Sequence, residues 1–509
     1  MHQRLRASPW AIVAILLGRG AAAQAQGAAP DGAVPVAVTG SGGLAMLSET
    51  ATFTDVVDAF DSGSSWSFRL SAGYQYQLHT ATVERELRAV MDPSTGIPQF
   101  ARVGQYRETT HTLLANAELA LYHDLALTFG VPVVLSNTRE IRRFPDANAT
   151  EGQGALTDGW THEGMPSNLF QLGDNGFRGP ERAGIDQVRL GLSWAILNQQ
   201  RDRTKPTWVV RFEWRPPVGP TMHACNSNPP MGVASCPSPE SVPSVPSSGV
   251  NSTGPTLRSA PTSGGGAGIS RGLHGLWFQT SLSRRLGYVE PYAALDVLAE
   301  FPQRDTPFKY LDTPYGLLAN FPPIVGNLTV GAEVIPWENR ETWQRVLLDF
   351  RVRGTYRSQG RDYSVLYDAL GSSPSRALAV PGCPSNVRND DGTCQAGRSV
   401  YFDGLTSTAS SIMLGTNITL AFQAARFLRF SVVGGLTWVT PHNITATDAC
   451  NPSTNPPPEH PEWRGGCVSN SAPDPLHRPA IDAPGNRFRT SDEFYWDLSA
   501  MLTLTPRFD

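Results

Sequence analysis

The sequence predicts an all-β fold, a transmembrane antiparallel up-and-down β-barrel of about 12 strands. Three observations predict it. Apolar and polar residues alternate with period two over many segments, the connections between these segments alternate between short and long, and aromatic residues gather near both segment ends. Because side chains alternate across a strand, each segment has one apolar face and one polar face.

The strands are predicted from this alternation. The clearest are 207–216 and 343–356, whereas Pro132 and Pro291 interrupt two others. A strand crosses a bilayer with about 9–11 residues, so the lengths are sufficient. The predicted strands are 65–77, 111–122, 125–136, 187–198, 207–216, 273–284, 288–301, 324–337, 343–356, 411–422, 427–439 and 494–508.

The connections predict the topology, because short and long ones alternate along the chain. In a meander of antiparallel strands, all short turns then lie at one end and all long loops at the other, as in membrane barrels. Part of the first long connection is expected to continue the first hairpin. The short connections are 123–124, 199–206, 285–287, 338–342 and 423–426, and the long ones are 78–110, 137–186, 217–272, 302–323, 357–410 and 440–493.

Aromatic residues on the apolar faces favour a barrel in lipid over a soluble β-sandwich. A sandwich also alternates apolar and polar residues, but it gives no reason for aromatic side chains at both strand ends, which membrane interfaces attract. Trp66, Trp208, Phe422 and Phe508 lie near turn ends, and Tyr74, Tyr76, Trp214, Trp438, Phe494 and Trp496 near loop ends.

The chain ends on FYWDLSAMLTLTPRFD, residues 494–509, with an apolar residue at every second position. This ending resembles the C-terminal sorting signal of bacterial outer-membrane β-barrel proteins, whose last strand ends on an aromatic residue. Phe508 fits in type, and Asp509 extends one residue past it. The resemblance is to a broad class. It implies assembly in the outer membrane of a Gram-negative bacterium, with outer-membrane lipids and the barrel-assembly machinery as partners.

The first 25 residues are predicted to be a signal peptide. Arg4 and Arg6 precede the apolar stretch 10–17, and Ala23-Gln24-Ala25 supplies the A-x-A cleavage pattern. The stretch is too short to span a bilayer as an uncleaved anchor. The mature chain then consists of a flexible lead-in, 26–64, and the barrel, 65–509, with both termini periplasmic because the strand count is even.

The six cysteines fall into three local pairs in long loops. Each pair lies within one Pro/Gly/Ser/Asn-rich segment, and an exported chain meets oxidising conditions, so disulfides are predicted. Zinc, the rival, prefers tighter spacing. The pairs are Cys225 with Cys236, Cys383 with Cys394, and Cys450 with Cys467.

Composition and motifs argue against other classes. The net charge is −4 and charged residues make up 17% of the chain, so no basic patch predicts nucleic acid as a partner. We expect no cofactor and no metal, because the histidines lack HExxH spacing and residues 389–392 lack the spaced ligands of a calcium loop.

The polar strand faces should line the lumen with eight basic and eight acidic side chains. They predict a channel or transport pore for small polar solutes, with these charges setting selectivity. An ion-pair network that fills a narrow barrel is the plainer interpretation. The candidates are Arg69, Glu118, Arg189, Arg211, Glu213, Arg215, Glu290, Asp296, Glu300, Glu333, Arg345, Asp349, Arg351, Arg353, Arg429 and Asp497.

Two alternative functions remain open. The first is a non-conducting surface barrel whose long, cross-linked loops bind a partner or ligand. The second is a barrel-borne lipid-modifying hydrolase with His274 as its base, although no serine stands beside His274 on that face. We therefore expect no enzyme. The sequence leaves the solute and the oligomeric state undetermined.

Overall fold

The structure is a computed structural model of the full chain. It describes residues 49–59, 67–91, 98–143, 176–225, 267–303, 308, 321–373, 378, 380–381, 399–400, 404–446, 467–468, 472–473, 479–482 and 486–505. Residues from Leu44 onward form one compact unit. Among the described residues, no helix has the length and apolar character needed to cross a membrane.

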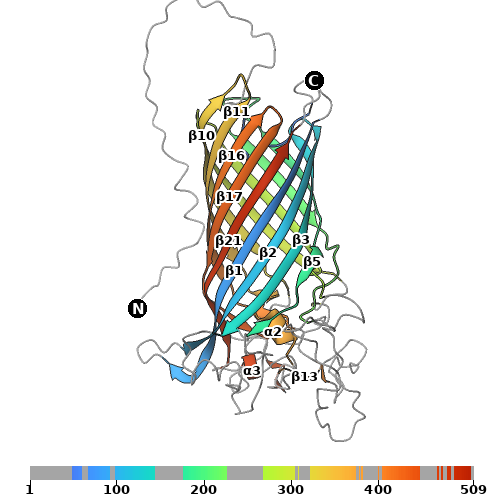
Figure 1. The fold of residues 1–509 in the computed structure, drawn as a ribbon, viewed down its shortest axis with the longest axis vertical. Helices are drawn as coiled ribbons and strands as arrows, with labels where there is room; N and C mark the ends of the chain where they lie inside the picture. Colours follow the sequence, from blue (N-terminus) through green and yellow to red (C-terminus); the bar gives the residue numbers. More distant parts are fainter. Residues whose placement is uncertain are drawn as a thin grey trace, which may run out of the picture. The chain divides into compact units, whose positions relative to one another are not determined.

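Twelve antiparallel strands form a closed barrel, which confirms the predicted fold class, and each predicted strand overlaps one of them (Figure 1). Each strand pairs with the next along the chain, and the last pairs with the first from Leu70↔Leu504 to Arg85↔Phe488, so no barrel edge is left unpaired. The strands are β1 (Phe68–Met91), β2 (Pro98–Tyr122), β3 (Leu125–Arg143), β6 (Arg189–Leu197), β7 (Thr207–Arg215), β8 (Leu273–Ser283), β9 (Val289–Pro302), β10 (Val325–Asn339), β11 (Gln344–Arg357), β16 (Ser411–Ala425), β17 (Leu428–Val439) and β21 (Phe488–Leu504).

The alternation in the sequence corresponds to the inside and outside of the barrel. On β7, Trp208, Phe212 and Trp214 are exposed on the outer face, whereas Arg211 turns inward. Exposed large apolar side chains continue around the wall, as Phe350 does on β11. A closed barrel with an apolar outer face satisfies its backbone hydrogen bonds in lipid, and this is the architecture of outer-membrane barrels.

The first hairpin is longer than a membrane crossing. β1 and β2 pair from Phe68↔Leu119 to Met91↔Pro98, so most of the predicted connection 78–110 is strand. The other long connections all leave from the same end, which we call the loop end, and the short turns lie at the opposite end, the turn end.

Short elements accompany the barrel strands. The helix α2 (Tyr367–Gly371) is entirely buried and is drawn at the loop end in Figure 1. The small strands β12, β15 and β18 continue the wall there through pairing with one another and with β21. The short elements are β4 (Phe177–Arg178), β5 (Arg182–Ile185), β12 (Gly360–Asp362), β13 (Val380–Pro381), β14 (Ser399–Val400), β15 (Thr406–Thr408), β18 (His442–Thr445), β19 (Cys467–Val468), β20 (Ala472–Pro473) and α3 (Pro479–Asp482).

Candidate functional site: the barrel lumen

A segment of the predicted lead-in, residues 49–59, lies inside the barrel; we call it the inner plug. The Thr52 N–H donates to Glu333 Oε2 at 2.9 Å, and the Thr54 and Ser283 hydroxyl oxygens are 2.7 Å apart. Glu333 and Ser283 belong to strands on the wall. Residues 26–64 were expected to be flexible, whereas this part of them has a defined place in the lumen.

Arginines from several strands bind the inner plug. Arg211 donates from Nη1 to the Phe53 carbonyl at 2.9 Å and from Nη2 to the Asp55 carbonyl at 3.1 Å. Arg345 bonds to the Glu49 carboxylate at 2.7 Å, and Arg69 forms an ion pair with Asp55. These bonds therefore hold the plug from three different strands of the wall, β7, β11 and β1.

An aromatic contact adds to these bonds. The Phe53 ring stacks on Tyr292, with ring centroids 4.5 Å apart and planes 16° from parallel, and the Arg351 guanidinium lies 4.8 Å from the Phe53 centroid. Gly331 makes the arrangement possible, because a Cβ at that position would lie 2.5 Å from the Tyr292 hydroxyl. Stacked rings and a cation over a ring each contribute about 0.5–1.5 kcal/mol.

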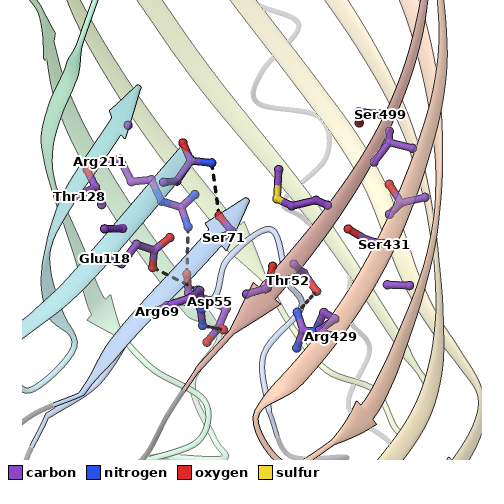
Figure 2. A pocket seen from close by; sticks show the side chains of 18 of the residues that line it. Thr52, Asp55, Arg69, Ser71, Glu118, Thr128, Arg211, Arg429, Ser431 and Ser499 are labelled. Carbon is purple, nitrogen blue, oxygen red and sulfur yellow. Dashed lines mark hydrogen bonds and ion pairs between the residues drawn. The ribbon is translucent and has the colours of Figure 1, made fainter. Parts of the chain in front are cut away.

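Beside the inner plug the lumen contains a cavity of about 420 Å³ (Figure 2). Thr52 and Asp55 of the plug face it together with charged and hydroxyl side chains of the wall, and Figure 2 shows the two plug residues between Arg211 and Arg429. A space of this size lies within the range of small-molecule sites.

The carboxylates that line the cavity are already paired. Glu118 and Asp55 both bond to Arg69, and Asp349 bonds to Arg351 at 2.5 Å. The other two lining carboxylates pair with arginines that do not line the cavity, with Glu213–Arg215 at 2.5 Å and Glu333–Arg285 at 2.9 Å. Each of these acids is therefore paired with an arginine.

At the loop end, α2 packs with Arg182, Met222 and an apolar cluster that includes Leu366 and Leu370; we call this structure the outer cap. Asp368 of α2 bonds to Arg182 at 2.5 Å, where the two side chains are 4% and 0% exposed, and lies 3.8 Å from Arg139 of β3. Leu366 and Leu370 pack in an apolar cluster with wall residues, among them Tyr106 of β2. On another side Tyr367 packs against Met222, so the helix also contacts the segment that follows β7.

The outer cap is joined to the wall by a chain of polar contacts. His79 of β1 bonds to Glu493 at 2.9 Å and to Glu108 at 3.3 Å, and Glu108 bonds to Arg139 at 2.9 Å. Arg139 in turn approaches Asp368. Barrel wall and cap therefore share one buried network, in which each charged group has an oppositely charged neighbour.

Charges outside the membrane strands also stabilise the loop end. Asp362 of β12 forms ion pairs with Arg271 and Arg357. Burial by itself would raise the pKa of Asp362, but the two guanidiniums outweigh it and hold that pKa below its usual value. His442 of β18 is the opposite case, because burial lowers its pKa more than the nearby Glu493 raises it.

The structure brings many of the predicted lumen residues together and separates others. Arg215 pairs with Glu213, and Asp296 and Asp497 accept hydrogen bonds from neutral side chains. Glu290 and Arg345 lie near the plug, and Glu300 pairs with Arg271 at the loop end. Arg353 is exposed. The predicted residues that line the cavity are Arg69, Glu118, Arg189, Arg211, Glu213, Glu333, Asp349, Arg351 and Arg429.

Three contributors to the site were missing from the sequence prediction. Asp55 and Thr52 lie in a stretch without strand alternation, and Arg285 lies in a turn. A run of apolar residues, 56–57, beside acidic Asp55 and Asp58 was the available signal of an ordered segment. It is too short to predict a place in the lumen.

The hydrolase alternative gains no support from the described residues. His274 stacks on the exposed Trp214, with ring centroids 6.1 Å apart, as expected for an interfacial side chain. Thr490 Oγ1 lies 3.0 Å from His442 Nδ1, but Thr490 is fully buried and no substrate could reach its hydroxyl. Among the described residues, no group of three or more His, Cys, Asp or Glu side chains is arranged to hold a metal ion.

The disulfide pairs stay predictions. Cys225 is fully buried, and Cys467 lies on β19. Cys236, Cys383, Cys394 and Cys450 fall outside the described residues, as do residues 389–392, Trp66 and Phe508.

No family model and no curated protein matches the sequence. Solved structures with similar folds include an outer-membrane channel from Pseudomonas putida F1, at 9% identity and TM-score 0.33 over 86% of this chain and 95% of that one. A Pseudomonas aeruginosa FadL homologue is 7% identical, with TM-score 0.29 over 86% and 90%. The outer-membrane protease OmpT of Escherichia coli is 7% identical, with TM-score 0.25 over 86% and 97%. At such scores we transfer no function from them.

Proposed function

We propose that this protein is an outer-membrane channel for small polar solutes, with the turn end and both mature termini in the periplasm. The observation that carries the proposal is the polar cavity inside a closed barrel. Its walls bear charged and hydroxyl groups that can replace the hydration of a polar solute, as channel linings do. Outer-membrane lipids and the barrel-assembly machinery are its expected surroundings.

The inner plug gives the proposed channel a movable barrier. Its bonds to the wall are hydrogen bonds and ion pairs, which water and solutes can replace, and each contributes about 0.5–3 kcal/mol net. The plug is one short stretch of chain connected to the wall strands through residues 60–67. A displacement of the plug would therefore open the turn end while the barrel stays closed through its strand pairing.

Single-channel recording in planar bilayers tests the proposal. We compare the mature chain with a variant that lacks residues 49–59. The variant should conduct steadily, and the mature chain should show smaller or rarer openings. A deletion of residues 340–341, in the exposed turn between β10 and β11, is the control and should behave like the mature chain. Absence of conductance from both the mature chain and the plug deletion, with circular dichroism showing a folded barrel, would contradict the channel proposal.

One observation favours the alternative of a non-conducting surface barrel. The outer cap is packed around buried α2, so the loop end is structured rather than open. In that case the plug deletion would leave the conductance at the baseline, and ligand binding would depend on the loops alone. We propose no catalytic activity, because the candidate His274 has no nucleophile within reach among the described residues.

A further inference from the structure

In the part of the chain that the structure describes, the cavity contains arginines without a carboxylate partner, whereas each of its carboxylates is paired with an arginine. The numbers of lining arginines and acids are equal, but the acids are engaged by guanidiniums within 3.1 Å, two of which lie outside the lining. Three lining arginines, in contrast, form no ion pair with any carboxylate of the described residues: Arg189, Arg211 and Arg429.

These three arginines differ in how they are used. Arg211 bonds to uncharged acceptors only, namely Ser193, Gln279 and the plug carbonyls. Arg429 donates one bond, from Nη1 to Thr52 Oγ1 at 2.9 Å. Arg189 has a buried Nε without an acceptor. The acid with the strongest electrostatic attraction for Arg189 is Glu213, which is already paired with Arg215.

A guanidinium has five N–H donors, and a buried donor without an acceptor costs free energy. The donors left open on these side chains therefore favour a group that supplies several acceptor oxygens and negative charge. Carboxylates and phosphates meet both conditions, and their bonds to arginine are the strong, charge-assisted kind. A cation would meet acids that are already paired with arginines.

We propose that the cavity binds a small oxyanion, a carboxylate or phosphate group, through Arg189, Arg211 and Arg429. The inference rests on the proposed channel function and names the class of solute. The volume of about 420 Å³ limits the solute to a small molecule.

The inner plug already carries a group of this chemistry. The Asp55 carboxylate faces the cavity and pairs with Arg69, while Arg211 holds the backbone on either side of it (Figure 2). A solute oxyanion would compete with the plug carbonyls for Arg211 and would repel the nearby Asp55 carboxylate. Binding of the solute thereby weakens the attachment of the plug, so the permeating class would itself promote opening.

Calorimetric titration of the folded mature chain in detergent tests this inference, with inorganic phosphate and acetate as separate probes at constant ionic strength. Arg189→Gln, Arg211→Gln and Arg429→Gln should each weaken binding of the preferred probe about tenfold or more, the loss expected for one charge-assisted bond. Asp55→Asn should tighten it, because the change removes a negative charge that faces the cavity.

Arg340→Gln is the control for overall charge. Arg340 is exposed in the turn between β10 and β11 and pairs with Glu338, so its loss should change binding less than about twofold, a difference small beside the tenfold expected for one bond. Equal losses in Arg340→Gln and the three cavity variants would overturn the inference. So would an absence of binding of both probes to the mature chain and to Asp55→Asn, given a folded barrel by circular dichroism.

The two proposals fail separately. If the plug deletion conducts but reversal potentials in a salt gradient show no anion preference and neither probe binds, the channel stands and the oxyanion site falls. If phosphate or acetate binds with the expected losses but no variant conducts, the site stands and the channel falls.

Discussion

The two ends of the barrel are closed by different kinds of structure. The inner plug at the turn end is an irregular segment, bound by arginines to its backbone and carboxylates. The outer cap at the loop end contains a helix within an apolar cluster that also includes Ile141, Phe177 and Phe488. Apolar burial stabilises by about 1.5–3 kcal/mol for each large side chain, so the cap has the larger cohesive energy.

This difference indicates which end can move. A polar segment in a polar lumen exchanges one set of hydrogen bonds for another when it leaves, at small net cost. The plug buries Val56 and Val57 against wall residues that are mostly alanines and stacks Phe53 on Tyr292, so its apolar contribution is smaller than that of the cap. The cap would expose a core if it left. We therefore expect the plug to open on a shorter timescale than the cap.

The largest effect is expected from Asp368→Asn in the outer cap. The change removes the charge that neutralises fully buried Arg182, and an uncompensated buried charge costs about 3–5 kcal/mol. Amide hydrogen exchange of 367–371 should accelerate strongly, while exchange of 51–57 stays at the wild-type rate. Asp202→Asn, at an exposed turn position, serves as the matched control. Unchanged exchange in the helix would contradict the importance of this pair.

Leu370→Ala should loosen the cap by a comparable or smaller amount. Leu370 is 1% exposed within the apolar cluster, and Leu→Ala changes in cores cost about 2–5 kcal/mol. Limited proteolysis near the loop end should become faster, whereas the conductance produced by plug deletion should persist. Proteolysis at the wild-type rate would show that the cluster does not hold the cap.

A smaller effect is expected from Glu49→Gln in the inner plug. The change replaces a charged acceptor of Arg345 by a neutral one and should cost about 1 kcal/mol, the difference between the two kinds of hydrogen bond. Exchange of the amides of 51–57 should rise about fivefold, and that of α2 should not change. Glu341→Gln, on an exposed turn, is the control. A rise in α2 as well would mean that the two closures are coupled.

The wall of the barrel could be predicted from the sequence, and its two closures could not. Lipid outside and a polar lumen inside impose alternation of apolar and polar residues on every strand, so each strand can be predicted from its own residues. The plug has no such period, because its order comes from partners far along the chain, as between Thr52 and Arg429. Helix α2 is five residues long, and one helical turn shows no amphipathic period.

The candidate site was predictable only as far as side-chain direction. Parity placed Arg211 and Arg429 in the lumen correctly, because strand register leaves no other choice. It could not tell that Glu213 is taken by Arg215, two residues away on the same strand, or that Arg345 is used by the plug. Pairing depends on rotamers and on neighbouring strands. The lining arginines without a carboxylate partner could therefore be identified only from the structure.

The smallest effect concerns pH, and it should be confined to the loop end. Burial lowers the pKa of His442, so the unfolded cap binds a proton more readily than the folded one. Stability therefore rises with pH through the unfolded pKa of about 6.5 and is lost as pH falls below it. Exchange of 442–445 should be faster at pH 5.5 than at pH 7.5 after correction for intrinsic rates, and His442→Gln should remove the difference.

The same pH change should leave 51–57 unaffected, because arginines bind the plug and stay charged throughout this range. Equal acceleration at both ends would contradict the separation of the two closures.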